Sequence, residues 1–540
     1  MTRFALLYGQ RWRRDLVQLT LWIAGTVALA GAAYAGVAQQ FGTEQDRVGL
    51  LQTVIANPVI LLFRGLPSGS DASSVMAFLI LPFLALMAAL MSTFLAVRHT
   101  RGDEEQQRTE LVAATPAGRT MPFAATAVHG ILANVVLGLL VTVTFVATGQ
   151  AAGGAVAIGA ASAATGIVFL AVALLLAQLV RTSRAANATS VWIVIIAFLA
   201  CGIGNALGTP SDDLLSLQSS PLAWVSPFGW AENTRPWSTD DPRPLLLSLA
   251  LTLVALAIAA ALQRVRDVGG ALLPERHGRA NAPASLRGPI SLAWRLSRGS
   301  TIGWMIGGLI AGLLATQLAS VVSQLGDTIA SVQALVSALS ANGSLAQGAV
   351  VIFFTVVGVL AACAGVQTLN RARQDEAHGL AEPVRAGAVG RVSWVASYGV
   401  VAALAVVATA AAAVLGAVVG LAGQSDPDWS LAGDAVISGA GQIPAALVFV
   451  VITALVLVVA PRLTILVGWT LVLLGLILGL FGPLFGLPDA VVNLSPVAVT
   501  PIVDSGGIDA RGVWWLVAIA VVGAVGALAL ARGRELEADG

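Results

Sequence analysis

The chain has 540 residues, of which 57% are hydrophobic and only 11% are charged, and its mean hydropathy is +0.86. Soluble globular domains carry about 25% charged residues, so this composition excludes that class and indicates a polytopic membrane protein. The formal net charge of +1 gives no indication of a nucleic-acid partner, and none is expected.

The chain contains twelve apolar stretches of about 20 residues or more, each long enough to cross a hydrocarbon core of roughly 30 Å as an α-helix. They lie at about 19–38, 73–95, 122–147, 151–180, 188–207, 244–263, 301–323, 348–369, 394–421, 435–460, 463–485 and 512–531. All 29 basic residues are arginines, and a cytoplasmic N-terminus places 24 of them inside and five outside. Because cytoplasmic loops are enriched in basic residues, we expect both termini in the cytoplasm and the chain in a bacterial plasma membrane.

Residues 1–18 combine four arginines with interleaved aromatic and apolar residues. This pattern is typical of a short amphipathic helix on the inner membrane face. The same pattern precedes the seventh span, at 292–298, in the middle of the chain where no signal peptide can lie. We therefore interpret the first span as a membrane helix rather than as a cleaved signal peptide.

A charged cytoplasmic stretch occurs twice, at 101–119 and, shifted by 272 residues, at 373–391, with eight identities in nineteen ungapped positions. Such self-similarity at about half the chain length indicates an internal duplication. The sequence therefore predicts an all-α polytopic membrane protein whose twelve transmembrane helices form two tandem six-helix halves, 1–270 and 271–540. Each half has an amphipathic connecting helix and a cytoplasmic coupling helix.

The first copy of this stretch is predicted to be one helix over about 103–115, with Asp103 as its N-cap and Gln106 three positions later. Pro116 and Gly118 would end it. A solvated turn remains the alternative. In the second copy Pro383 follows Glu382, and a proline inside a helix costs about 3 kcal/mol or more, so we expect that helix to be shortened or kinked.

An apolar segment at 221–230 lies between the fifth and sixth spans on the external side. It is too short to span and too apolar for a free loop, which predicts a re-entrant or interfacial piece that includes Trp224, Pro227, Phe228 and Trp230. A matching Ser-Pro pair that ends at Pro496 occupies the corresponding place in the second half.

The predicted spans contain no Asp, Glu, Arg or Lys, and His129 is their one histidine, beside the two cysteines Cys201 and Cys363. A lone histidine is more often a hydrogen-bonded packing residue than a proton carrier, and the cysteines fit small buried apolar positions. A chain without lysine cannot form a phosphate-binding P-loop, and no zinc-protease pattern occurs. No catalytic residue, bound cofactor or metal is therefore expected, and energy for transport would come from another protein.

The order of these features resembles the ABC-2-type (type V) exporter permeases, and more narrowly the actinobacterial exporter-of-polyketide-antibiotics family of multidrug and antibiotic efflux proteins. The resemblance rests on the twelve fused spans, the Arg-x-Asp-Glu motif and its later Glu-Leu, and the external Ser-Pro-Phe motif.

The resemblance implies a permease that moves hydrophobic or amphiphilic compounds out of the cell through the bilayer. It implies two copies of a separate ATPase, which would bind ATP and Mg²⁺ and contact one coupling helix each. The implied coupling residues are Arg101, Asp103, Glu104, Glu105, Glu110, Arg119, Arg373, Asp375, Glu376, Glu382 and Arg391. Because the two copies differ, we predict unequal docking of the two ATPases.

Two other functions remain open. The first is a self-contained secondary transporter or lipid-moving protein, which would depend on an ion gradient; the absence of charge in the spans disfavours it. The second is a non-transporting membrane scaffold or sensor, in which the cytoplasmic helices would recruit a signalling partner.

Overall fold

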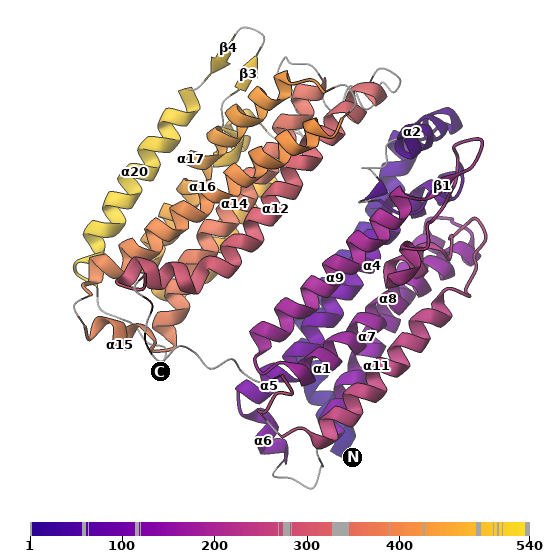
Figure 1. Cartoon of the computed structure of the whole chain (residues 1–540), viewed down its shortest axis with the longest axis horizontal. Helices are drawn as coiled ribbons and strands as arrows, with labels where there is room; N and C mark the ends of the chain where they lie inside the picture. The colour runs from indigo at the N-terminus through magenta and orange to yellow at the C-terminus, as the bar shows by residue number, and fades with distance from the viewer. Residues whose placement is uncertain are drawn as a thin grey trace. The chain divides into compact units, whose positions relative to one another are not determined.

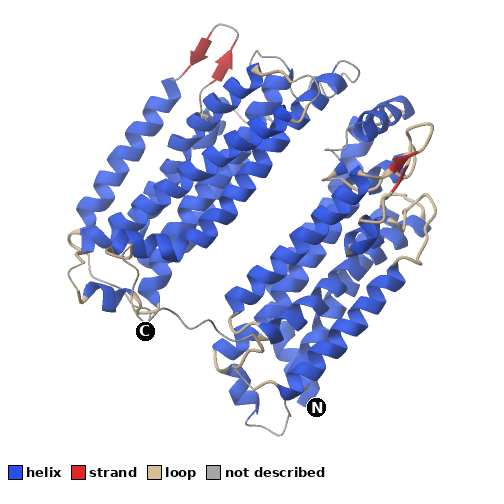
Figure 2. Ribbon diagram, in the orientation of Figure 1, coloured by secondary structure: helices blue, strands red, loops and turns tan. Residues whose placement is uncertain are grey.

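The computed structural model describes residues 3–534 apart from several short segments and one longer one. The segments outside the description are 57–60, 63, 114–117, 119, 268, 274–280, 282, 284, 327–344, 388, 425–426, 482–487, 500–501, 505–506 and 510. The described chain is almost entirely helical, with two short β-hairpins (Figure 2). It divides into two compact units, Met1–Gly278 and Arg279–Gly540.

The first unit is a bundle built around α8, which packs against α4, α7, α9 and α11. Its helices are α1 (Arg3–Gln40), α2 (Glu44–Ala56), α4 (Ala72–Arg98), α5 (Arg101–Glu105), α6 (Arg108–Ala113), α7 (Met121–Ala147), α8 (Ala152–Leu179), α9 (Ser183–Ala206), η1 (Ala223–Val225), α10 (Pro227–Glu232) and α11 (Leu245–Val265). The strands β1 (Thr209–Pro210) and β2 (Leu217–Gln218) pair antiparallel. Figure 1 places α5 and α6 at one end of this unit and α2 and β1 at the other.

The second unit is a bundle in which α14 and α17 pack against each other and against most of the remaining helices. Its helices are α12 (Pro289–Gly326), α14 (Leu345–Ala377), α15 (Ala381–Arg385), α16 (Arg391–Ala422), α17 (Ser430–Val459), η2 (Pro461–Leu463), α18 (Thr464–Leu476), the π-helical turn η3 (Ile477–Phe481), α19 (Asp489–Val492), η4 (Pro496–Ala498) and α20 (Arg511–Ala531). The strands β3 (Ile502–Asp504) and β4 (Gly507–Asp509) form the second hairpin. In Figure 1 this hairpin and α15 lie at opposite ends of the unit.

The two units share one pattern of helix pairing. In the first, α4 packs on α8, α7 on α8, α11 on α8 and α1 on both α4 and α7. The second repeats each pair in order, with α14 on α17, α16 on α17, α20 on α17 and α12 on both α14 and α16. This correspondence supports the internal duplication that was predicted from the repeated charged stretch.

Within the described residues, twelve helices are long and apolar enough to cross a membrane, in agreement with the predicted number. Two bounds differ in an informative way. The amphipathic stretch 1–18 and the first span are not separate helices, because α1 is helical without a break from Arg3 to Gln40. The tenth span begins earlier than predicted, so that α17 includes Asp434, which is buried.

The prediction of one coupling helix over 103–115 is wrong. The first helix, α5, begins at Arg101 rather than after an Asp103 cap. Gln106 and Gln107 interrupt the helix, since they lie between the end of α5 and the start of α6. Gln107 has a φ of 58°, a left-handed conformation that cannot continue an α-helix. The first copy of the charged stretch is therefore two short helices joined by a sharp turn.

The second copy is also interrupted, but not by its proline. Here α14 runs through Ala377, a turn with Gly379 at a φ of 71° follows, and α15 begins at Ala381. Gly379 corresponds to Gln107 under the shift of 272 residues. Pro383 is the third residue of α15, where the backbone N–H would have no intrahelical partner, so the proline is tolerated. Both copies thus bend at the same position.

Glycine residues allow close approach of two helices where α7 crosses α8. A Cβ atom added to Gly138 would lie 2.7 Å from the carbonyl oxygen of Gly159, and one added to Gly159 would lie 2.5 Å from that of Gly138. These distances leave no room for side chains, so the two backbones are in direct contact.

Candidate functional site

The candidate functional site is the charged region around α5, whose three consecutive acidic residues each contact a different helix of the first unit. Asp103 pairs with α1, Glu104 with the residue after α11, and Glu105 with the start of α9. Since α5 directly follows α4, these contacts connect one short segment to four long helices.

Glu104 lies between two buried arginines. Its carboxylate accepts from Arg101 Nη1 at 2.7 Å and forms an ion pair with Arg266, whose Nη1 lies 3.1 Å from Oε2. Arg101 is fully buried and also donates to the carbonyl oxygens of Ala177 and Gln178 at the end of α8. Two cations around one buried carboxylate offset the desolvation cost of all three groups.

Asp103 and Glu105 extend this network. Asp103 Oδ1 lies 3.0 Å from Arg14 Nη1 on α1 and 3.3 Å from Arg108 Nη1 on α6. Glu105 accepts from the backbone N–H of Ser183 at 2.7 Å and from its hydroxyl, in the first turn of α9. A carboxylate at a helix N-terminus satisfies an otherwise free N–H group.

The second unit repeats the central pair of the network. Glu376, which corresponds to Glu104, forms an ion pair with Arg534 and accepts from Trp394 Nε1 at 2.9 Å. Arg534 follows α20 as Arg266 follows α11. We call the two copies of the charged stretch, 101–119 and 373–391, the coupling segments. In each unit a buried ion pair joins the coupling segment to the end of the sixth long helix. We call it the acid–arginine pair (Glu104–Arg266 or Glu376–Arg534).

Asp375 has different partners from Asp103. Its carboxylate lies 2.9 Å from Arg371 Nε and accepts from the Tyr398 hydroxyl at 2.6 Å. The first unit instead places His99 near Asp103, with His99 Nδ1 3.6 Å from Asp103 Oδ2. The two units therefore share the acid–arginine pair but differ in the groups around the neighbouring aspartate.

The residues predicted to contact an ATPase divide into buried and exposed sets. Arg101, Arg373, Asp375 and Glu376 are buried, and Asp103 and Glu104 are mostly enclosed. Glu105, Glu110, Glu382 and Arg391 are exposed, and Arg119 lies outside the described residues.

In each copy of the charged stretch, the short helix that follows the bend carries exposed side chains. We call α6 and α15 the tip helices. The side chain of Leu111 on α6 is 74% exposed, and Leu380, just before α15, is 56% exposed. An exposed leucine beside an exposed glutamate, Glu110 in one unit and Glu382 in the other, is a surface that a partner groove can cover.

The segment 221–230, which was predicted to be external, is not a free loop. Trp224 is 40% exposed, whereas Phe228 and Trp230 are buried where α10 packs on α8, α9 and α4. Ser226 caps α10 and donates to the carbonyl oxygen of Ala197 on α9 at 2.6 Å. Whether this segment is re-entrant stays a prediction.

The same arrangement recurs in the second unit. Pro496 begins η4, which packs on α17, α18 and α14, the helices that correspond to those under α10. Ser495 donates to the carbonyl oxygen of Gly475 on α18 at 2.7 Å. The Ser-Pro pair therefore joins a short helix to the fifth long helix in each unit.

Glu232 is a buried carboxyl group at the end of α10, outside the spanning helices. Burial raises its pKa to about 7, and the hydrogen bond from Asn205 Nδ2, at 2.6 Å, opposes the shift only in part. Near neutral pH a substantial fraction of this group is therefore protonated.

Sequence reasoning did not single out Arg266, Arg534, Glu232 or Asp15. One signal was present for each arginine, because it follows the sixth span of its half. Asp15 is the one acidic residue among residues 1–18, within an arginine-rich stretch. The Asp15 carboxylate accepts a hydrogen bond from His129. This confirms the prediction that His129 is a hydrogen-bonded residue.

The fold and these networks define a multi-pass, α-helical membrane protein of the permease class, built from two related six-helix units. The family model described as "Multidrug efflux system permease Rv1217c, C-terminal domain" matches residues 7–264 and 286–532. The chain is also 33% identical over 529 residues, 96% of its own length and 93% of the relative's, to the multidrug efflux system permease protein Rv1217c of Mycobacterium tuberculosis. The chain therefore belongs to this multidrug efflux permease family.

Proposed function

We propose that this protein is the membrane-spanning subunit of an ATP-driven exporter that moves hydrophobic or amphiphilic drugs out of the cell. In this proposal the two tip helices, α6 and α15, receive a separate ATPase, one copy for each half. The partner binds ATP and Mg²⁺, and the permease itself carries out no hydrolysis. Both termini and both tip helices would face the cytoplasm.

The observation that carries the proposal is the paired acid–arginine contact. Glu104 and Glu376 are each buried against an arginine that follows the sixth long helix of their unit. A tip helix that is pushed by a partner would therefore move a segment connected to several long helices at once. Interfaces between packed elements change between discrete arrangements rather than bending continuously, which suits transmission of an ATPase cycle.

The character of the substrate is supported by an apolar groove in the second unit. It has a volume of about 360 Å³ and is lined by α16, α17 and α20, with Gly399, Ala403, Ala454 and Ala524 providing the space between larger side chains. Drug-sized pockets of this volume that have few polar groups select by size and hydrophobicity rather than by specific hydrogen bonds. The relative from Mycobacterium tuberculosis is named a multidrug efflux permease, which agrees with such loose selection.

Reconstitution tests the proposal against a secondary transporter. The purified chain is placed in liposomes with and without a candidate partner ATPase, and movement of a fluorescent hydrophobic dye is followed. Transport that requires ATP and the ATPase, and survives collapse of the proton gradient, is expected. Transport by the chain alone that stops when the gradient is collapsed would contradict the proposal. If the ATPase binds but no dye moves, the result would favour the alternative of a non-transporting membrane scaffold or sensor.

A further inference from the structure

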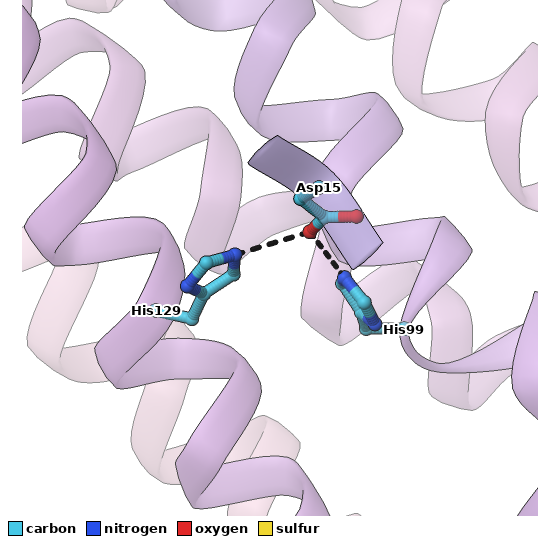
Figure 3. A group of neighbouring side chains, drawn as sticks. All are labelled: Asp15, His99 and His129. Atoms are coloured by element: carbon cyan, nitrogen blue, oxygen red, sulfur yellow. Dashed lines mark hydrogen bonds and ion pairs between the residues drawn. The ribbon is translucent and has the colours of Figure 1, made fainter. Parts of the chain in front are cut away.

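Three ionisable side chains from three helices converge in the first unit. Asp15 lies on α1, His99 caps the C-terminus of α4, and His129 lies on α7 (Figure 3). Both imidazoles direct Nε2 to the same carboxylate oxygen of Asp15, His129 at 3.0 Å and His99 at a shorter contact. One potential ligand atom from each residue lies within 4.8 Å of the other two, and all three residues are buried. We call this group the Asp15 cluster.

His99 lies between two carboxylates. Its Nε2 faces Asp15 and its Nδ1 lies 3.6 Å from Asp103 Oδ2. A neutral imidazole that binds a metal ion through Nε2 carries its N–H on Nδ1, which is the nitrogen that faces Asp103.

We propose that the Asp15 cluster is a binding site for a divalent transition-metal ion, of which Zn²⁺ is the best match. Two imidazoles and one carboxylate are a common three-ligand set for Zn²⁺, with water completing the coordination. Asp103 would act on His99 as the outer carboxylate that fixes the tautomer of a metal-bound imidazole. This proposal departs from the sequence-based expectation that the chain binds no metal, and it does not depend on the proposed transport function.

Unused polar atoms in the cluster point to the same ligand. Asp15 Oδ1 has no hydrogen-bond partner among the described residues, although it is buried. Arg98 Nε is 3.4 Å away, too far for a good hydrogen bond, and the Arg98 guanidinium donates instead to Gln18 Oε1 and to the carbonyl oxygen of Arg14. A metal ion bound by both oxygens of Asp15 would engage the unused one.

The cluster distinguishes the two units. At the corresponding level of the second unit, Asp375 is paired with Arg371 and Tyr398, a set that offers a metal no imidazole. A metal ion at the Asp15 cluster would therefore hold α1 against α4 and α7 in one unit only, next to the aspartate at the start of its coupling segment.

Metal binding by the full-length protein tests the proposal directly. The chain is purified in detergent with a tag that contains no histidine, treated with EDTA and titrated with Zn²⁺. Bound zinc per chain, the thermal midpoint and the absorption spectrum with Co²⁺ are measured. We expect about one Zn²⁺ per chain, a raised thermal midpoint and a four-coordinate Co²⁺ spectrum.

Substitutions assign the site. Asp15→Asn and His129→Gln should reduce Zn²⁺ affinity by at least roughly 10-fold, and Asp103→Asn should reduce it by about 10-fold through loss of the outer carboxylate. His378→Gln alters an exposed histidine that contacts its own helix backbone, and should leave affinity unchanged.

The substitution His129→Cys retains a ligand, so it should keep Zn²⁺ and add a sulfur-to-cobalt band to the Co²⁺ spectrum. This gain of signal decides the question even if Asp15→Asn fails to fold. Absence of stoichiometric Zn²⁺ uptake, or uptake that is equal in wild type, Asp15→Asn and His129→Gln, would overturn the proposal. The cluster would then be a carboxylate hydrogen-bonded to two histidines, with no metal ion.

Discussion

Glu232 is the residue whose titration the structure predicts most clearly. Its side chain is buried and accepts a hydrogen bond from the amide of Asn205. The raised pKa of about 7 means that the folded protein keeps a proton that the unfolded chain releases near pH 4.5. The stabilisation from this group is therefore fully present below pH 4.5 and is lost as the pH rises towards 7, by an amount on the order of 3 kcal/mol.

This pH dependence is checked by thermal unfolding in detergent. The midpoint of the wild type should fall between pH 4.5 and pH 8, and Glu232→Gln, which keeps the shape without the charge, should remove part of that fall. Glu44→Gln on α2 changes an exposed carboxyl group and serves as the control. An identical pH profile for wild type and Glu232→Gln would show that Glu232 ionises normally in the folded protein.

At the scale of secondary-structure elements, the bends in the two coupling segments can be compared residue by residue. Gln107 and Gly379 occupy the same position in the two copies and both have positive φ. A non-glycine residue in this conformation costs about 1–2 kcal/mol, whereas glycine adopts it freely. The first copy therefore carries backbone strain that the second avoids.

Substitutions at Gln107 and at Gly379 should change the free energy of unfolding in opposite directions. Gln107→Gly should raise the free energy of unfolding by up to about 1 kcal/mol, because relief of strain exceeds the extra entropy of the unfolded chain. Gly379→Ala should lower it by about 1 kcal/mol. Gln106→Gly, at a φ of −92°, is the control and should not stabilise. A stabilising Gly379→Ala would mean that the turn is absent in solution.

The tip helices bear on the predicted asymmetry of ATPase docking. Because both copies bend at the same position, Pro383 is not the cause of a difference in helix continuity. What differs is the surface, since the exposed Leu111 of α6 corresponds to Pro383 of α15. Unequal docking stays a prediction, and it now depends on this pair of residues.

At the scale of the whole molecule, hydropathy and the repeated stretch were sufficient to predict twelve helices and their duplicated order. Length and apolar composition determine where a chain can span a bilayer, so these features follow from local sequence. The acid–arginine pairs could not be predicted in the same way, because Glu104 and Arg266 are 162 residues apart and their contact depends on helix packing.

The predicted bounds of the short helices were wrong for a related physical reason. Asp103 has the right chemistry for an N-cap, but its carboxylate is used by Arg14 on a distant helix. Tertiary ion pairs of this kind override local capping preference. The Asp15 cluster was missed likewise, because its three members come from three helices and His129 looks isolated in the sequence.

The central claim is that energy reaches this protein through its tip helices from a separate ATPase. The most direct measurement is ATP turnover by that ATPase, with and without the purified permease in lipid nanodiscs. Glu110→Arg and Glu382→Arg alter the two tip helices, and Arg184→Glu reverses an exposed charge in the first turn of α9 as the control.

We predict that the wild type and Arg184→Glu stimulate ATP turnover equally and that each tip variant loses stimulation, by about tenfold for a loss of 1.4 kcal/mol in docking, and to unequal extents. Equal losses of stimulation in the two tip variants would contradict the prediction of unequal docking but not the central claim. Full stimulation by both tip variants, or none by the wild type, would contradict the account itself.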